Sequence, residues 1–316
     1  MCDLLVAKGY RVFGFVRDAT PPTRVPREVT LIHGDLTRAA SIRDAVAQAA
    51  PDQLYNFGGV TDLATAYQQP ELTWQVNAEA VATMVDAALE VNPAVRFLQA
   101  SSSEVFLPSE APLTEASPRD WQTQNPYAKA KMAVDRDVIA RARARGGFAV
   151  SAILFNHESP RRSDKSVLRK IARTLARIRG GDPTPLRLGN LDMARDWGFA
   201  GDYAEAMWRM LQREVADDFV IATGRLHTVK DAVEIAAAAL GLELRWSGEG
   251  ADTIARDVDE RRVVEVDPTL FRPAERHPKV GDPGKASRLL GWRSTVGLRA
   301  LVELMVRAEL SAAVQP

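Results

Sequence analysis

The sequence predicts an α/β protein with a doubly wound parallel sheet, followed by a smaller, mixed α/β domain. Strand and helix patterns alternate from Tyr10 to about Asn156, and this alternation is typical of a parallel sheet with helices on both faces. The predicted strands are short apolar runs, as expected for strands buried on both sides. Beyond residue 156 the alternation ends, and prolines gather in GDPTPLRLGN and DPTLFRPAERHP. The chain therefore divides into a larger and a smaller part.

Each predicted element of the larger part has a local signal. A first helix ends near Lys8 and is closed by Gly9, since glycine adopts the left-handed cap readily. The predicted strands are YRVFGFVR (10–17), VTLIHGDL (29–36), DQLYNFGG (52–59), AVRFLQASSS (94–103) and FAVSAILFNH (148–157). The predicted helices are SIRDAVAQAA (41–50, with Ser41 as N-cap), TWQVNAEAVATMVDAALEV (73–91) and the segment 125–147, with Pro126 in its first turn.

The same pattern sets the expected domain boundaries. Residues 1–155 are predicted to form a Rossmann-type domain, a fold that binds dinucleotides at the carboxyl ends of its strands. Residues 156–316 are predicted to form mostly a substrate-binding domain, with a helix in LHTVKDAVEIAAAALG (226–241). Within it, about 190–225 is expected to return to the first domain.

The expected first element of a Rossmann-type sheet is not found in the sequence. Such a sheet normally opens with a strand, a glycine-rich turn and a helix, whose N-terminus binds the pyrophosphate. Met1 falls inside the expected first helix, and no G-x-x-G-x-x-G precedes YRVFGF. We therefore expect the first strand and the glycine-rich loop to be missing, as in an N-terminally truncated chain.

The amino-acid composition excludes several classes of function. Lys+Arg and Asp+Glu are equal at 41 each, so the chain has no net charge that would attract nucleic acid or a membrane surface. No apolar run is long enough to span a membrane, and the N-terminus lacks the features of a signal peptide. One cysteine and four scattered histidines give no pattern of metal ligands. The sequence predicts a cytoplasmic protein without a metal, nucleic-acid or membrane partner.

Tyr127 and Lys131 form the motif Y-A-K-A-K near the start of the helix predicted at 125–147. Side chains four residues apart lie on one face of a helix, so the phenol and the ammonium are expected to lie together. Free tyrosine has a pKa of about 10, and a nearby ammonium lowers it by stabilising the phenolate. The pair therefore predicts a base that removes a hydroxyl proton while hydride leaves the same carbon.

Hydroxyl side chains end the strand predicted at 94–103, and Glu104 follows directly. Ser102 and Glu104 are two residues apart, so in an extended chain both side chains point to the same side. Ligands of such sheets bind at the carboxyl ends of the strands. A hydroxyl that can bond the reacting oxygen and a carboxylate are therefore expected over one crevice.

Serine, tyrosine and lysine in this order and rhythm resemble the extended short-chain dehydrogenase/reductase family. Further blocks narrow this resemblance to the GDP-mannose 4,6-dehydratase family and cover nearly the whole chain. They are ILFNHESPRR (153–162), LRLGNLDMARDWGFAGDYAEAMWRMLQ (186–212), FVIATG (219–224), RPAE (272–275) and VGDPGKASRLLGW (280–292).

The resemblance implies a lyase that converts GDP-mannose to GDP-4-keto-6-deoxymannose and water, with NADP recycled internally. It implies that Ser102 holds the C4 oxygen, Tyr127 with Lys131 is the base at C4, and Glu104 is the base at C5. The residues it implies for the cofactor are Arg17, Asp35, Leu36, Phe57, Gly58, Gly59, Val60, Thr61, Leu72, Lys131, His157 and Arg162. Those it implies for the GDP-sugar are Asn156, Arg195 and Arg272. A homo-oligomer, dimer or tetramer, is also expected.

Arg17 supports NADP on physical grounds, because an arginine after this strand suits the 2′-phosphate, whereas an acidic residue would bond the 2′-hydroxyl of NAD. Two alternatives stay open at this point. One is a 4-ketoreductase or 4-epimerase for a similar nucleotide sugar, which needs no base at C5. The other is a non-catalytic remnant that keeps the fold and binds a nucleotide sugar or a partner chain. The missing phosphate loop favours this alternative, and the four catalytic candidates oppose it.

Overall fold

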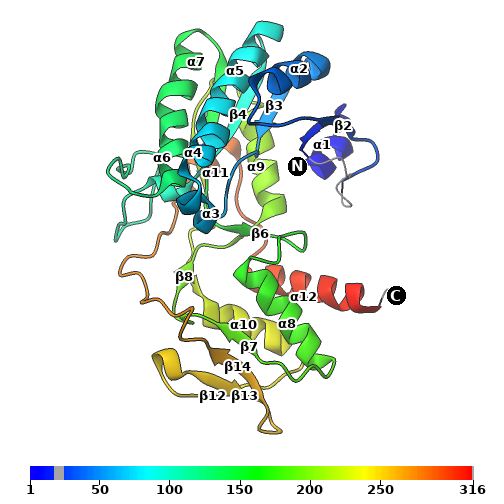
Figure 1. The fold of residues 1–316 in the computed structure, drawn as a ribbon, viewed down its shortest axis with the longest axis vertical. Coiled ribbons are helices and arrows are strands. Elements are labelled where there is room, and N and C mark those ends of the chain that lie inside the picture. Colours follow the sequence, from blue (N-terminus) through cyan, green and yellow to red (C-terminus); the bar gives the residue numbers. More distant parts are fainter. Residues whose placement is uncertain (18–24, 315–316) are drawn as a thin grey trace.

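The computed structural model describes residues 1–17 and 25–314 and has two parts, each with its own sheet (Figure 1). The larger part, at the top of Figure 1, holds four parallel strands in the order β10-β5-β4-β3. Their bounds are β3 (Gln53–Asn56), β4 (Arg96–Ser102), β5 (Phe148–Leu154) and β10 (Phe219–Ile221). A separate parallel pair is formed by β1 (Phe13–Val16) and β2 (Thr30–His33). The predicted α/β class with a parallel sheet is confirmed.

Helices cover both faces of the four-stranded sheet. Phe97 of β4 packs in one apolar cluster with α2, α5 and α7, whereas its neighbour Leu98 packs in another with α9 and α11. This alternation is what a doubly wound sheet requires. The helices of this part are α1 (Cys2–Ala7), α2 (Ala39–Ala49), α3 (Leu63–Gln68), α4 (Pro70–Trp74), α5 (Ala80–Val91), α6 (Pro126–Ala133), α7 (Ala140–Ala144), α9 (Ala200–Met210) and α11 (Gly284–Leu290).

Two of the predicted helices are continuous but contain a π turn. The π segment Gln75–Glu79 joins α4 to α5, and Val134–Ile139 joins α6 to α7. A third predicted helix begins earlier than expected. Arg38 is the N-cap residue of α2, and the Ser41 hydroxyl instead accepts the backbone N–H of Asp35 at 2.9 Å. The prediction of Ser41 as N-cap is wrong, because its side chain binds the preceding turn.

The smaller part, at the bottom of Figure 1, is a mixed sheet packed against three helices. Its strands have the order β12-β13-β14-β7, with β14 parallel to β7 and the other pairs antiparallel. The elements are β7 (Leu186–Leu188), β12 (Arg245–Ser247), β13 (Ile254–Arg256), β14 (Arg262–Val266), α8 (Val167–Arg179), α10 (Val229–Ala239) and α12 (Leu298–Val314). This is the mixed α/β arrangement expected for the second half of the chain.

The chain crosses between the two parts more than once. Residues 200–221 return to the larger part, where α9 packs on the sheet and β10 pairs with β5. Residues 284–292 return as well, because Ala286 and Trp292 pack in the same cluster. Short pairs lie between the parts, namely β6 (His157–Glu158) with β9 (Gly198–Phe199) and β8 (Ala194–Arg195) with β11 (His227–Thr228). The exact boundaries at residues 155 and 156 stay a prediction.

Side chains, rather than a backbone ladder, hold α1 and the β1–β2 pair against the rest of the molecule. In the described residues, neither β1 nor β2 pairs with β3. Trp208 of α9 donates its indole N–H to the Tyr10 hydroxyl at 3.0 Å, and Lys8 pairs with Glu205 at 3.3 Å. Arg161 bonds Asp3 of α1 at 2.8 Å. Among the described ranges, no helix has the length and apolarity needed to cross a membrane.

Candidate active site

The helix that carries Tyr127 and Lys131 is fixed at its N-terminus by Asn125. The Asn125 side-chain oxygen accepts the backbone N–H of Tyr127 at 3.0 Å and that of Ala128 at 3.4 Å. Pro126 occupies the first helical position, where a missing N–H costs nothing. The cap and the proline together place Tyr127 in the first turn of α6, beside the carboxyl end of β4.

Replacing Asn125 with Ala is expected to lower the free energy of unfolding by about 1 kcal/mol, since the cap hydrogen bonds are lost. Urea denaturation measures this change. Thr228→Ala is the matched control, because Thr228 caps α10 in the smaller part. Both variants should lose stability, but only Asn125→Ala should also lower turnover, since only that cap orients Tyr127. Equal turnover in the two variants would contradict this role of Asn125.

Ser102, Tyr127 and Lys131 meet at the end of β4. The Ser102 side chain lies close enough to the Tyr127 hydroxyl for its hydrogen bonding to lower the pKa of that phenol. The Lys131 Nζ lies 5.6 Å from the centroid of the Tyr127 ring and donates to the Ala100 carbonyl at 2.7 Å. The Lys131 side chain is buried. The geometry therefore gathers a hydroxyl, a phenol and an ammonium at one strand end.

Burial controls the protonation of this group. Desolvation raises the pKa of Tyr127, which the hydrogen bond from Ser102 opposes and the charge of Glu104 reinforces. Desolvation also lowers the pKa of Lys131 to about 8. The expected fall in the pKa of Tyr127 is therefore wrong for this structure. The reason is that the phenol is withdrawn from water, and the Lys131 ammonium is bonded to a backbone carbonyl rather than to the phenol oxygen.

Glu104 lies in a 3₁₀ turn, Ser103–Val105, directly after β4. The extended-chain argument that aligned it with Ser102 is therefore wrong, although the Ser102 hydroxyl does accept the Glu104 backbone N–H at 3.2 Å. The turn leaves the Glu104 side chain 41% exposed and brings it to 3.7 Å from the Lys279 Nζ. Glu104 follows Ser103 in the turn at the end of β4, and its charge raises the pKa of Tyr127.

Arg17, Asp35 and Leu36 lie where two neighbouring strands end. Arg17 follows β1, and Asp35 follows β2. The pKa of Asp35 is lowered by its hydrogen bonds from Thr37, and the charges of Arg38 and Arg17 add to this effect. The Asp35 carboxylate accepts the Thr37 backbone N–H at 2.8 Å, so it also closes the turn.

The stretch after β3, residues 57–61, packs against Leu36 and is held by the buried side-chain amide of Asn77. A Cβ at Gly58 would lie 2.7 Å from the Leu36 side chain, and one at Gly59 would lie 2.8 Å from the Asn77 side-chain oxygen. Asn77 also bonds both backbone groups of Val60, at 2.7 and 2.8 Å. Phe57 and Thr61 are exposed on either side of this close approach. The backbone after β3 therefore packs closely on the end of β2 through Gly58 and on Asn77 through Gly59.

Leu72 lies apart from these cofactor candidates. It lines a pocket of about 690 Å³ between α4 and the start of α6, together with Trp74, Pro126 and Lys129. None of the four catalytic candidates lines this pocket. Pro126 is the neighbour of Tyr127, so the pocket adjoins the catalytic helix from outside.

His157 and Arg162 follow β5. The His157 Nδ1 lies 2.9 Å from the Phe155 carbonyl, and the ring packs 5.0 Å from that of Tyr203. Desolvation lowers the pKa of His157, so the neutral ring is favoured at neutral pH. Arg162 pairs with the buried carboxylate of Glu158 at 3.4 Å, and its charge acts on Tyr127. Of the two candidates, Arg162 is the one whose charge reaches Tyr127, whereas His157 packs against Tyr203 of α9.

The three substrate candidates are spread along the boundary between the two parts. Asn156 is exposed directly after β5. The Arg195 guanidinium makes a two-pronged ion pair with Glu275, at 2.7 and 3.1 Å. Arg272 is exposed, and its backbone carbonyl accepts the Asn190 amide at 3.0 Å. The segment 272–281 thus connects Arg195 with Lys279 and Glu104.

Three residues at the site were missed in the sequence. They are Asn77, Lys279 and Asp135, whose side chains contact Val60, Glu104 and Ser101 respectively. Asp135 lies four residues after Lys131, and this helical spacing was a usable signal. Asn77 and Lys279 act across the fold and carry no local signal.

The comparison with known proteins decides the family. A family model described as GDP-mannose 4,6 dehydratase matches residues 1–305 of the chain. The chain belongs to the GDP-mannose 4,6-dehydratase family. A relative from Arabidopsis thaliana, GDP-mannose 4,6 dehydratase 2, is 37% identical over an alignment of 330 positions, gaps included, that covers 99% of this chain and 84% of that protein. The predicted family, and with it the lyase class of dehydratases, is confirmed.

Solved structures confirm the fold. UDP-glucose 4-epimerase from Thermus thermophilus, in complex with NAD, superposes with a TM-score of 0.80 at 22% identity, covering 98% of this chain and 94% of that one. RMD from Pseudomonas aeruginosa, complexed with NADPH, gives a TM-score of 0.76 at 21% identity and covers 92% of each chain. The fold of this dehydratase family member is therefore one on which nicotinamide dinucleotides bind.

Proposed function

We propose that this dehydratase converts GDP-mannose to GDP-4-keto-6-deoxymannose and water, with NADP as its recycled cofactor. The observation that carries the proposal is the meeting of Ser102 and Tyr127 at the end of β4, with Lys131 behind them and the Glu104 carboxylate beside them. Oxidation at C4 needs the first three side chains. Elimination of water needs a further base at C5, and Glu104 supplies a carboxylate at the same strand end.

The residues present fit a nicotinamide dinucleotide phosphate. Gly58 and Gly59 let the backbone after β3 pack closely on the Leu36 and Asn77 side chains, and the absence of a Cβ leaves this turn without bulk of its own beside the ends of β2 and β3. Arg17 at the end of β1 would hold the 2′-phosphate, and Asp35 and Leu36 would lie under the adenosine. Lys131 and His157 would lie at the opposite end, near the reacting ring. When bound, the cofactor supplies the hydride acceptor and returns the hydride at the end of the cycle.

The chain's own side chains would then move the protons. Tyr127 takes the proton of the C4 hydroxyl, and Ser102 holds the C4 oxygen by a hydrogen bond. Lys131 keeps a positive charge behind the phenol as it ionises. The C4 ketone acidifies C5, and Glu104 removes the C5 proton. The C6 hydroxyl takes this proton from Glu104 and leaves as water, which creates a C5–C6 double bond. The hydride returned at the end of the cycle would add to C6, and C5 takes up a proton from solvent.

Incubation of the purified protein with GDP-mannose and NADP⁺ tests the proposal. Mass spectrometry should show a nucleotide sugar lighter by one water, without net formation of NADPH. A product of unchanged mass would indicate an epimerase, and a product formed only with stoichiometric NADPH would indicate a reductase. Either result would contradict the proposed dehydration.

Replacing Arg17 with Asp tests the choice of cofactor. We expect the preference for NADPH over NADH to fall by roughly tenfold or more, on the scale of the charged hydrogen bonds lost to the 2′-phosphate. Fluorescence titration with each reduced cofactor measures the preference. Arg27→Asp is the matched control, since Arg27 is exposed and lies before β2. Tighter binding of NADH than of NADPH by the unmutated protein would overturn the assignment.

The homo-oligomer and the cytoplasmic location expected from the sequence stay predictions. Size-exclusion chromatography with light scattering measures the first directly.

A further inference from the structure

Successive residues at the end of β4 are tied to one face of the catalytic helix. Lys131 donates to the carbonyl of Ala100 at 2.7 Å, and Asp135 accepts the hydroxyl of Ser101 at 2.8 Å. Hydrogen bonding to Ser102 lowers the pKa of Tyr127. The three helix residues are four apart, so they lie on one face. Tyr127 and Lys131 have roles in the proposed function, whereas Asp135 has none there.

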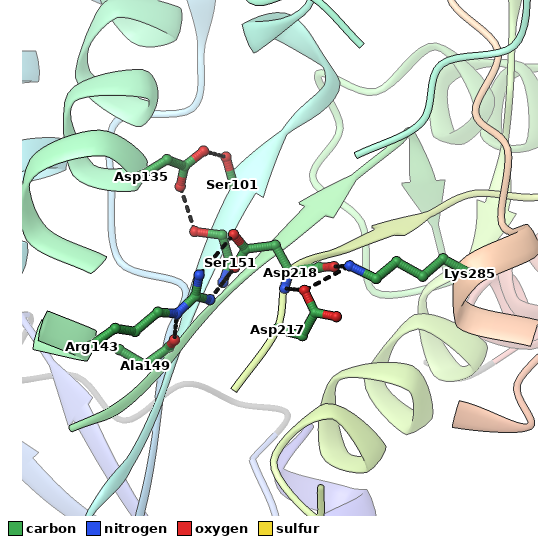
Figure 2. Close-up of polar contacts among 8 residues, drawn as sticks. All are labelled: Ser101, Asp135, Arg143, Ala149, Ser151, Asp217, Asp218 and Lys285. Carbon is green, nitrogen blue, oxygen red and sulfur yellow. Dashed lines mark hydrogen bonds and ion pairs between the residues drawn. The ribbon is translucent and has the colours of Figure 1, made fainter. Parts of the chain in front are cut away.

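Asp135 is also tied to the neighbouring strand (Figure 2). Its second carboxylate oxygen accepts the hydroxyl of Ser151 on β5 at 2.5 Å. Two hydroxyl donors on two oxygens suit an ionised carboxylate, which only accepts hydrogen bonds. Asp135 lies in the π turn Val134–Ile139, which interrupts the catalytic helix at this point. Such turns redirect side chains and are frequent at functional sites.

We propose that Asp135 is a positioning residue of the catalytic site, which ties the ends of β4 and β5 to the catalytic helix and supplies the negative charge behind the Lys131 ammonium. The proposal rests on the proposed function, because it takes Tyr127 and Lys131 as the catalytic pair. It explains why the buried Lys131 ammonium stays charged next to the Tyr127 phenol, although Lys131 is withdrawn from water.

The charges around Asp135 agree with this role. Desolvation raises the pKa of Asp135, and the hydrogen bonds from Ser151 and Ser101 oppose that rise. The charge of Asp218 also raises it, and that of Arg119 lowers it. For Lys131, the charge of Asp135 opposes the lowering of its pKa by desolvation.

Asp218 does not act on Asp135 as a free charge. Both of its carboxylate oxygens accept the Arg143 guanidinium, and one also accepts the Ser151 backbone N–H at 2.6 Å (Figure 2). Arg143 in turn donates to the Ala149 carbonyl at 2.6 Å. The Arg143 guanidinium therefore offsets much of the charge of Asp218. The carboxylate whose charge acts on Lys131 is Asp135.

Titration of Lys131 by NMR tests the proposal without any turnover. Protein labelled with ¹³C-lysine gives the pH dependence of each lysine Cε signal, and Lys131→Met identifies the signal of Lys131. In Asp135→Asn, which keeps the shape of the side chain but not its charge, we expect Lys131 to lose its proton at a lower pH than in the unmutated protein. Desolvation is then no longer opposed.

Activity gives a second readout of the same change. The alkaline limb of turnover should move to lower pH in Asp135→Asn, so the loss is larger at pH 8, on the order of tenfold for each unit by which the Lys131 midpoint moves below the assay pH. A merely structural loss would lower turnover equally at all pH values. Absence of GDP-mannose turnover in the unmutated protein would count against the proposed function, yet it would leave the NMR titration unaffected.

Asp137→Asn is the matched control, since Asp137 lies in the same π turn but is 55% exposed and paired with Arg136. It should leave the Lys131 titration unchanged. If Asp135→Asn does not fold, Ser151→Ala removes one hydrogen bond from the carboxylate and should lower the Lys131 midpoint by a smaller amount. An unchanged Lys131 midpoint in Asp135→Asn, or in Ser151→Ala where only that variant folds, overturns the proposal.

Discussion

Tyr127→Phe is expected to abolish turnover of GDP-mannose while leaving binding of the GDP-sugar nearly intact. The phenol is the group that Ser102 contacts at the end of β4, and it is the base assigned to the C4 hydroxyl. Loss of a positioned general base typically lowers a rate by ~10²–10⁴-fold. Phenylalanine keeps the ring and its packing, so the cofactor and substrate sites should stay formed. Steady-state turnover and calorimetric titration with GDP-mannose measure the two effects separately.

Tyr67→Phe is the control for this change. Tyr67 lies on α3 with 56% of its surface exposed. Tyr67→Phe therefore removes a phenol hydroxyl in the same way, but away from the end of β4. Its turnover should equal that of the unmutated protein. Full activity of Tyr127→Phe would remove Tyr127 from the mechanism.

Glu104→Gln is expected to retain cofactor binding but to lose the elimination of water. Solvent deuterium should enter C5 of the product with the unmutated protein, because the C5 proton exchanges through the Glu104 carboxylate. The variant should not introduce deuterium there, and dehydration should fall by ~10²–10⁴-fold. Mass spectrometry of product formed in deuterium oxide measures both quantities. The glutamine keeps the size of the side chain, so the contact with Lys279 is weakened rather than replaced by a cavity.

Glu110→Gln is the matched control, because Glu110 lies on the loop after Glu104 and its side chain is 83% exposed. It should dehydrate GDP-mannose at the unmutated rate. If Glu104→Gln does so as well, Glu104 is only a loop carboxylate, and the argument for dehydration over reduction or epimerisation fails.

The strands and long helices could be predicted from the sequence because their signals are local. Apolar runs such as the one at 148–157 became β5, and Pro126 marked the first turn of α6. The family could be recognised as well, since its motifs, such as FNHESPRR, are short continuous segments of the sequence. Predictions that relied on ideal local geometry were weaker. The Ser102 hydroxyl accepts the backbone N–H of Glu104 in the 3₁₀ turn Ser103–Val105, and the Ser41 hydroxyl accepts that of Asp35. Neither arrangement follows the ideal strand or helix geometry on which the predictions relied.

The electrostatics of the site could not be predicted from spacing. The direction of the pKa shift of Tyr127 depends on how far the phenol is withdrawn from water, and this depends on the packing of α6 against the end of β4. Lys279 lies 175 positions after Glu104 in the numbering, and only the fold brings the two side chains to 3.7 Å. Contacts of this kind are visible only once the segment 272–281 is placed.

The attachment of α1 and the β1–β2 pair by side chains has a consequence for the dynamics of the molecule. The four-stranded sheet can open only if several backbone ladders break together. In the described residues, this unit is held by side-chain contacts such as Tyr10 with Trp208 and Lys8 with Glu205, and by apolar packing against Tyr55 and Trp208. Local opening of such a unit costs less free energy than global unfolding. Amide hydrogens of β1 and β2 should therefore exchange with solvent faster than those of β4 and β5. Because Arg17 ends β1, the affinity for a dinucleotide would then include the free energy of holding this unit closed.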